Sequence, residues 1–460
     1  MQMDRRGLAL STGSGAAAEA YNTAIDRYFE YRLDTMKHVK AALEADPDFV
    51  MAHCLQGYLF MLFGTNAVLG KARAAHEACL ARAEAANPRE AAHIAALGTW
   101  ISGDVERTVA LWDRIIFEHP LDLLAIRLQH FALFWLGRSH ALCGSVARVL
   151  PAWSEDLSGY GNILGMLAFG LEECGEYAEA EARGRQAVAK NAEDLWAVHA
   201  VAHVLEMQGR RREGLVWLDY PADQWDDRNP FRGHLWWHRA LYALELGQHD
   251  QVLALYDRSV CSDDFQFYLD VQNAASLLLR LELQGQEVGD RWRPLAEHAE
   301  TALDDHVLVF TDLHNVMALA RVGRSDTAVK LLDSLKSQAQ AQGDGAMGIV
   351  ETVIEPTARA ILAYAEGDHA TAIELLLPIR YGLAPMGASH AQRDIFAQLL
   401  LECAIRSQQW DLAQGLVSER LTWGKDGVDS WLKFAEVLEG RGDSAGASNA
   451  RTRAAEIAEN

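Results

Sequence analysis

The 460-residue sequence has few residues that break or cross-link a chain, with 10 prolines and six cysteines. No two cysteines have C-x-x-C spacing, so the pattern predicts reduced thiols rather than a disulfide framework. No apolar run approaches the roughly 18 residues of a membrane span, and the GLAL segment after Arg6 is too short for a signal peptide. We therefore expect a cytoplasmic protein. The six cysteines are Cys54, Cys79, Cys143, Cys174, Cys261 and Cys403.

Positive charge is also scarce, because 42 Lys and Arg face 64 Asp and Glu, for a formal net charge of −22. Such a surface repels nucleic-acid phosphates and anionic membranes, and no local basic cluster offsets it. The phosphate-binding patterns G-x-x-x-x-G-K-[ST] and G-x-G-x-x-G are absent, as is G-x-S-x-G after a strand. We predict no nucleic-acid partner, no membrane partner and no nucleotide cofactor.

A glycine recurs between helical segments at intervals of 32 to 44 residues, which is typical of a helix-turn-helix repeat. Several units carry a small residue five positions later, where the second helix packs closely on the first. The predicted connectors are Gly64, Gly103, Gly137, Gly175, Gly209, Gly247, Gly285, Gly323 and Gly367, then Gln408 and Gly440. The small residues are Ala180, Gly214, Ala328, Ala372, Ala413 and Ala445.

The pattern predicts an all-α fold, a tetratricopeptide-repeat superhelix (α-solenoid) of about ten helix-turn-helix units that could close around a central pocket. Pro47, Pro88 and Pro120 mark where new first helices begin. No segment has a convincing strand pattern. We expect residues 1–18 to be mobile and 19–460 to form one domain, with inserted segments at 221–230 and 347–356.

Four segments carry a family resemblance. LALSTGSGAAAEAYN, SVARVLPAW, DHVLVFTDLH and LLLPIRYGLAPMGASHAQRDIF resemble those of the tetratricopeptide repeat protein 38 family, of the bacterial type, over nearly the whole chain. The resemblance implies a closed-up tetratricopeptide array of about this length. It implies no particular activity.

Histidines concentrate on the predicted first helices, which line the inner wall of such an array. Two H-x-x-x-H pairs stand out, because residues four apart lie on one helical face. The set is His53, His93, His130, His199, His203, His234, His238 and His314, of which His199, His203, His234 and His238 form the pairs.

Three interpretations of the paired histidines stay open. The imidazoles could hydrogen-bond within a partly buried wall, bind a divalent metal such as zinc, or form a metal-free acid–base pocket. The candidate catalytic residues are His199, His203, His238 and Glu206, the last on the face of His203. Asp312 and His314 could reach this site if the array closes tightly.

Other candidates for the pocket wall are polar or aromatic. Trp196 and Trp236 lie on or near the histidine faces, and Tyr160 and Asn162 begin an intervening helix. Arg393 either binds a ligand carboxylate or belongs to an Arg–Asp network that holds the glycine-rich turn MGAS. For His53, His93 and His130, taken singly, the structural interpretation is favoured over ligand binding.

Two functional classes follow. In the first, a His- and Trp-lined pocket binds a small molecule and acts on it by acid–base or metal-assisted chemistry; in the second, the groove is a scaffold for a peptide or protein. The abundance of His and Trp favours the first. Whether the protein is an enzyme and whether it forms a homodimer stay open.

Overall fold

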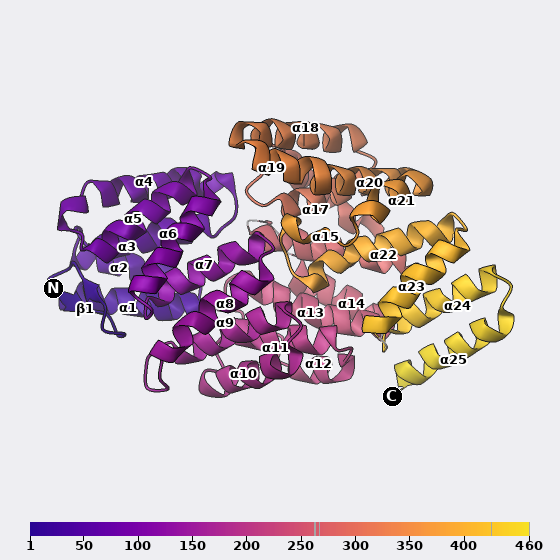
Figure 1. Cartoon of the computed structure of the whole chain (residues 1–460), viewed down its shortest axis with the longest axis horizontal. Helices are drawn as coiled ribbons and strands as arrows, with labels where there is room; N and C mark the ends of the chain where they lie inside the picture. Colours follow the sequence, from indigo (N-terminus) through magenta and orange to yellow (C-terminus); the bar gives the residue numbers. More distant parts are fainter. Residues whose placement is uncertain (262–263, 266, 425, 460) are drawn as a thin grey trace. The chain divides into compact units, whose positions relative to one another are not determined.

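The computed structural model describes residues 1–261, 264–265, 267–424 and 426–459 and consists almost entirely of helices (Figure 1). The chain divides into two compact units, which are described separately. Unit 1 comprises Met1–Val201 and Ala222–Arg232, and unit 2 comprises Ala202–Pro221 and Gly233–Asn460. Helix α11 (Leu195–Met207) begins in unit 1 and ends in unit 2.

The N-terminal segment contains a short β-hairpin, although no strand was expected from its sequence. Strands β1 (Gln2–Met3) and β2 (Ala9–Leu10) pair antiparallel. The Ala9 carbonyl accepts hydrogen bonds from Asn87 at 3.1 Å and from Arg89 at 2.9 Å. Helix α1 then begins at Gly15, with Ser14 accepting from the Ala17 amide. Two-residue strands are too short to leave a periodic signal, so only their tertiary partners reveal them.

Unit 1 continues as pairs of adjacent helices. Within each repeat, the helix before the glycine connector is called the first helix and the one after it the second helix. The elements are α1 (Gly15–Phe29), α2 (Thr35–Ala45), α3 (Val50–Met61), η1 (Asn66–Val68), α4 (Leu69–Leu80), η2 (Ala83–Ala85), α5 (Pro88–Ile101), α6 (Val105–Glu118), α7 (Leu123–Trp135), α8 (Ser139–Val149), η3 (Leu150–Ala152), α9 (Tyr160–Glu173) and α10 (Tyr177–Lys190).

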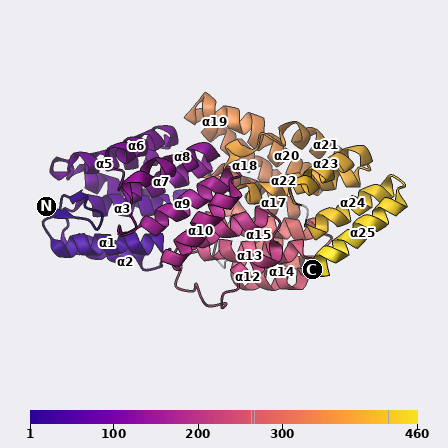
Figure 2. The same cartoon turned by 60° about the horizontal axis from the view of Figure 1, so that its bottom comes forward.

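Unit 2 repeats the same motif, and its last two helices lie side by side in both views (Figures 1 and 2). Its elements after α11 are α12 (Arg211–Trp217), α13 (Phe231–Glu245), α14 (His249–Leu255), η4 (Tyr256–Val260), α15 (Tyr268–Leu283), η5 (Gly289–Arg291), α16 (Trp292–Thr301), α17 (Val309–Arg321), α18 (Ser325–Gln342), α19 (Asp344–Ile349), η6 (Val350–Ile354), α20 (Glu355–Glu366), α21 (His369–Leu376), η7 (Leu377–Ile379), η8 (Ala384–Met386), α22 (His390–Arg406), α23 (Trp410–Trp423), α24 (Val428–Gly440) and α25 (Ser444–Glu459).

The predicted connectors adopt the left-handed backbone that a tight turn between two helices requires. Gly64 through Gly367 all have positive φ, and Gln408 has φ 54° despite its side chain. The last connector is corrected from Gly440 to Gly442, because Gly440 ends α24 and Gly442 has φ 82°. The fold is therefore the predicted all-α array of helix-turn-helix units, of the tetratricopeptide-repeat type.

The small residues five positions after the connectors sit where two helices touch. Ala180, Ala328, Ala372 and Ala413 are fully buried. A Cβ added to Gly214 would lie 2.4 Å from the ring of Tyr242, so only glycine fits there. The corrected connector shifts the last small position as well, and the buried residue is Ala447, whereas the predicted Ala445 is exposed. Close helix pairing thus depends on these positions.

First helices form the core of each unit. Helix α15 is buried at every position from Leu269 to Leu281, whereas its partner α16 buries one face through Trp292, Leu295, Ala296 and Ala299. A helix buried all round must satisfy its polar side chains internally. Polar residues on first helices are therefore the natural candidates for a site.

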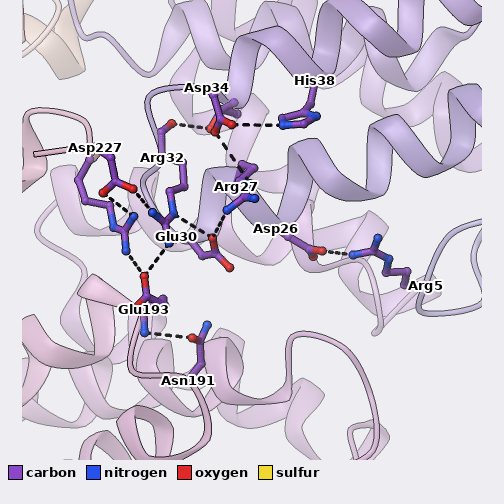
Figure 3. Close-up of polar contacts among 12 residues, drawn as sticks. Arg5, Asp26, Arg27, Glu30, Arg32, Asp34, His38, Asn191, Glu193 and Asp227 are labelled. Carbon is purple, nitrogen blue, oxygen red and sulfur yellow. Dashed lines mark hydrogen bonds and ion pairs between the residues drawn. The ribbon is translucent and has the colours of Figure 1, made fainter. Parts of the chain in front are cut away.

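The insertion between the histidine pairs forms a strap, residues 222–232, that belongs to unit 1. The Asn229 amide donates to the Tyr31 carbonyl at 2.6 Å, and the Leu33 amide donates to Asp227 at 3.1 Å. Arg32 forms ion pairs with Glu193, at 2.7 Å, and with Asp227 (Figure 3). Backbone hydrogen bonds and ion pairs therefore both hold the strap against the α1–α2 turn.

The second predicted insertion, 347–356, is helical rather than a loop, since α19 continues through the π-helical turn η6 into α20. Among the described residues, no helix has both the length and the apolar character needed to cross a membrane.

Candidate functional site

All eight singled-out histidines lie on first helices, as predicted. They occupy α3, α5, α7, α11, α13 and α17. Those of α11 and α13 are nearly or fully buried, with His203 and His238 at 0 % exposure and His234 at 3 %. The two helices position them because H-x-x-x-H spacing repeats one helical face.

His203, His234 and His238 of unit 2 form one cluster. A ring nitrogen of each lies within 4.8 Å of a ring nitrogen of both others. The rings of His203 and His238 are centred 4.5 Å apart, and those of His234 and His238 4.8 Å apart. The imidazoles from α11 and α13 therefore converge on one point.

The Nδ1 atoms of two histidines face oxygen acceptors on other helices. His234 Nδ1 lies 2.8 Å from Asn273 Oδ1 of α15, and His238 Nδ1 lies 2.9 Å from Glu206 Oε2 of α11. The Asn273 amide oxygen can only accept, so Nδ1 of His234 carries the proton. The ionised form of Glu206 gives His238 the same tautomer, with the lone pair on Nε2. This is the tautomer that metal-binding histidines adopt when an outer group orients them.

Trp237 and Arg280 complete the surroundings. The indole of Trp237 stacks on His234 at 5.1 Å and donates to Ser276 Oγ at 3.0 Å. The Arg280 guanidinium lies 5.5 Å from the Trp237 ring centre and donates to the Ala391 carbonyl at 2.8 Å. Trp237, three residues after His234 on α13, therefore contacts the cluster.

Burial sets the charge state of the cluster. It lowers the pKa of His234 and of His238 well below the usual range, assisted by the neighbouring imidazoles. Burial raises the pKa of Glu206 to about 7, against the opposing effects of His203, Arg211 and Arg280. His234 and His238 are thus neutral near pH 7, while Glu206 exchanges a proton there.

This arrangement fits two kinds of chemistry. Neutral imidazoles protonated at Nδ1 suit zinc and other first-row divalent ions, which bind through Nε2. A carboxyl that titrates near neutral pH beside an imidazole suits general acid–base catalysis. The nearby Arg280 disfavours a cation, so the carboxylate form of Glu206 would have to offset it.

In unit 1, His199 stands one helical turn before His203 on α11 and packs among aromatic rings. Phe169 stacks on it at 5.3 Å, Trp196 lies at 5.0 Å and Phe231 of the strap at 5.3 Å. Trp196 therefore lies on the predicted histidine face.

His93 has the structural role favoured for it. Its Nε2 lies 3.0 Å from Asp122 Oδ2, and its Nδ1 lies 3.2 Å from the Tyr58 hydroxyl. Asp122 also accepts from Arg89 at 2.7 Å and from the Ala125 amide, so it ties α5 to the start of α7. Both ring nitrogens of His93 are engaged in this internal network.

Tyr160 and Asn162 lie on α9 in unit 1. Asn162 donates to Asp194 at 2.8 Å, and Asp194 accepts from the first amides of α11. Tyr160 packs with Leu164 and Ala187, with the Lys190 ammonium 5.5 Å from its ring centre.

Asp312 and His314 have partners close to them in sequence. His306 Nδ1 lies 3.1 Å from Asp312 Oδ1, and His314 Nδ1 donates to the Phe310 carbonyl at 2.7 Å. Burial raises the pKa of Asp312 to about 6 and lowers that of His314 to about 4. The predicted reach toward the paired histidines is replaced by these local contacts.

The contacts of Arg393 match the second role suggested for it, in a network that holds the glycine-rich turn. Its guanidinium donates to the carbonyls of Gly387, at 3.0 Å, and Ala388 in the MGAS turn. The adjacent Asp394 pairs with Arg420 at 2.6 Å. Residues 387–394 thus fix an irregular helix junction.

The sequence interpretation missed Asn273, Arg280 and Trp237. Asn273 and Arg280 lie on α15, which has no histidine, so no motif marked that helix. The available signal was that polar residues interrupt a long apolar helix, a pattern typical of side chains with buried partners.

No family model matches the chain. A human IFIT1 dimer with PPP-AAAA is 14 % identical, covers 96 % of this chain and 94 % of its own, and has a TM-score of 0.42. A monomeric IFIT1 mutant with Gppp-AAAA is 13 % identical, covers 96 % and 95 %, and scores 0.39. The P58(IPK) TPR domain is 13 % identical, covers 80 % and 93 %, and scores 0.23. Likenesses this low establish neither a shared site nor a shared function.

Proposed function

We propose that unit 2 binds a divalent metal of the zinc type through His203, His234 and His238, and that this site binds a small ligand. The observation that carries the proposal is the orientation of two imidazoles by oxygen acceptors, Asn273 for His234 and Glu206 for His238. Such outer contacts typically tune metal affinity 10- to 100-fold. His199, the fourth histidine of the two pairs, belongs to unit 1 and is not part of this proposal.

When bound, the metal would polarise a ligand oxygen or lower the pKa of a coordinated water. Glu206 contributes from the protein side. Its pKa of about 7 lets it accept or release a proton near neutral pH, and its contact with His238 fixes that ring. Acid–base chemistry on a small molecule is therefore the activity we propose.

A small ligand is favoured over an extended peptide because the cluster is buried. His203 and His238 have no exposed surface, and the Glu206 side chain is 16 % exposed. A peptide-binding groove needs accessible side chains along its length. The resemblance to the tetratricopeptide repeat protein 38 family and the cytoplasmic location stay predictions beside this proposal.

The test is zinc binding by the full-length protein. We expect about one zinc per chain in elemental analysis, removable by chelator and restored by titration. His203→Ala and His238→Ala should each weaken zinc binding at least tenfold, and Asn273→Ala should weaken it less.

His249→Ala is the matched control, because His249 is a partly buried histidine of unit 2 that contacts Gln284 rather than the cluster. It should leave zinc affinity unchanged. A protein that binds no zinc, or whose zinc affinity is lowered equally by His249→Ala and His238→Ala, would contradict the metal proposal.

A further inference from the structure

Unit 1 contains a buried guanidinium without a carboxylate partner. Arg127 of α7 is 7 % exposed, and its guanidinium lies 4.2 Å from the ring centre of Trp196 and 5.6 Å from that of Tyr31. It forms side-chain hydrogen bonds with the hydroxyls of Tyr31 and Tyr28. In the described part of the chain, the partners given for it are these hydroxyls and aromatic rings rather than a carboxylate. A buried charge of this kind is costly unless something neutralises it.

The carboxyl of Asp194, whose charge acts on Arg127, has its own hydrogen-bond donors. Asp194 accepts from the Trp196 and Ala197 amides through Oδ1 and from Asn162 through Oδ2. Burial raises its pKa to about 6, and Arg127 opposes this only partly. Asp194 therefore acts mainly as the cap of α11, and the charge of Arg127 is left for another anion.

A second buried donor lies beside Arg127. Trp196 is 9 % exposed, and its indole Nε1 has no hydrogen-bond acceptor among the described residues. The ring of the fully buried His130 lies 5.7 Å from that of Trp196. Burial, with the adjacent Arg127 charge, holds the pKa of His130 well below its usual range. Arg127 therefore carries the positive charge of this region. The buried indole N–H of Trp196 is a hydrogen-bond donor that a ligand could satisfy.

The backbone at this place is strained. Tyr31 has φ 59°, a left-handed conformation that a residue with a bulky side chain rarely adopts. The strap holds it there, because Asn229 bonds its carbonyl and Phe231 stacks on its ring at 4.4 Å and 17°. Glu193, Arg32 and Asp227 anchor the strap to the same turn (Figure 3). Strain that the surroundings enforce is concentrated at functional sites.

We infer that unit 1 binds a small organic carboxylate with a planar apolar body, in a site formed by Arg127, Trp196, Tyr31 and Phe231. The guanidinium receives the carboxylate through its fork of N–H donors, and the Trp196 indole donates to the same ligand. The aromatic rings contact its apolar body. This site is distinct from the histidine cluster of unit 2 and does not depend on a metal.

Benzoate is the probe, with the isosteric neutral benzamide as its comparison, both titrated calorimetrically into the full-length protein. We expect benzoate to bind at least tenfold more tightly than benzamide, because only benzoate neutralises Arg127. Arg127→Lys should lower benzoate affinity about tenfold, since it keeps the charge and loses the fork. Trp196→Phe should lower it about fivefold, since it keeps an aromatic ring and removes the donor.

Trp153→Phe is the matched control, because the Trp153 indole already donates to the Pro120 carbonyl at 2.9 Å. Near-ultraviolet circular dichroism checks that each variant folds. Equal affinity for benzoate and benzamide would overturn the inference, as would equal benzoate binding by Trp196→Phe and Trp153→Phe. Binding of inorganic phosphate without benzoate would also overturn it and assign a different anion.

Discussion

Glu206→Gln should change how the stability of unit 2 depends on pH. Burial raises the pKa of this carboxyl from 4.5 to about 7, and the side chain is 16 % exposed. Ionising it in the folded protein therefore costs about 3 kcal/mol, at 1.36 kcal/mol for each tenfold change in proton affinity. Below pH 4.5 the carboxyl is protonated in both states and contributes nothing to the difference.

Between pH 4.5 and 7 the unfolded carboxyl ionises while the folded one keeps its proton. The free energy of unfolding of the wild type therefore falls as pH rises through this window and levels off above pH 7. Glutamine cannot ionise, so Glu206→Gln removes this loss. The lowered pKa values of His234 and His238 act in the opposite direction, with stability lost as pH falls below about 6.5, and both proteins share that effect.

Urea denaturation followed by circular dichroism, in chelator, measures the effect at several pH values from 4 to 8. The stability of Glu206→Gln relative to wild type should rise by about 3 kcal/mol across that range. Glu366→Gln is the control, because Glu366 is an exposed residue at the end of α20. A stability difference between Glu206→Gln and wild type that stays constant with pH would refute the reasoning.

Two further predictions concern the repeats, and thermal or urea denaturation checks both. Gly214→Ala should destabilise by about 1–3 kcal/mol through overlap with the Tyr242 ring, whereas Gly415→Ala, in open space on α23, should stabilise by up to about 1 kcal/mol. Equal effects of the two would contradict the packing argument. Gln408→Gly should stabilise by about 1 kcal/mol, because glycine adopts φ 54° without strain. A loss of stability would mean that the Gln408 side chain contributes more than the strain costs.

The repeat fold could be predicted because its signals are local. A left-handed connector favours glycine, and a close helix crossing requires a small residue at a fixed distance from it. The last connector was predicted two residues too early because Gly440 and Gly442 are both glycines. Only the positive φ of Gly442 shows which of them forms the turn. The H-x-x-x-H spacing likewise predicted which faces of α11 and α13 carry the histidines.

The partners of those faces could not be read from spacing. Asn273 reaches His234 across 39 residues and Glu206 reaches His238 across 32, and neither belongs to a motif. Arg127 was not singled out because an arginine in a helix usually faces solvent. Its burial becomes evident only once Trp196 and Tyr31 are seen on either side of it.

By itself, therefore, the sequence determined the helices, their connectors and which histidines share a face, because each depends on residues within one or two helical turns. The tertiary structure decided that the N-terminal strands pair, that the strap joins Tyr31, that His238 meets Glu206, and that Arg127 hydrogen-bonds to tyrosine hydroxyls. Those outcomes depend on contacts between distant segments, which set burial and charge and leave no local pattern.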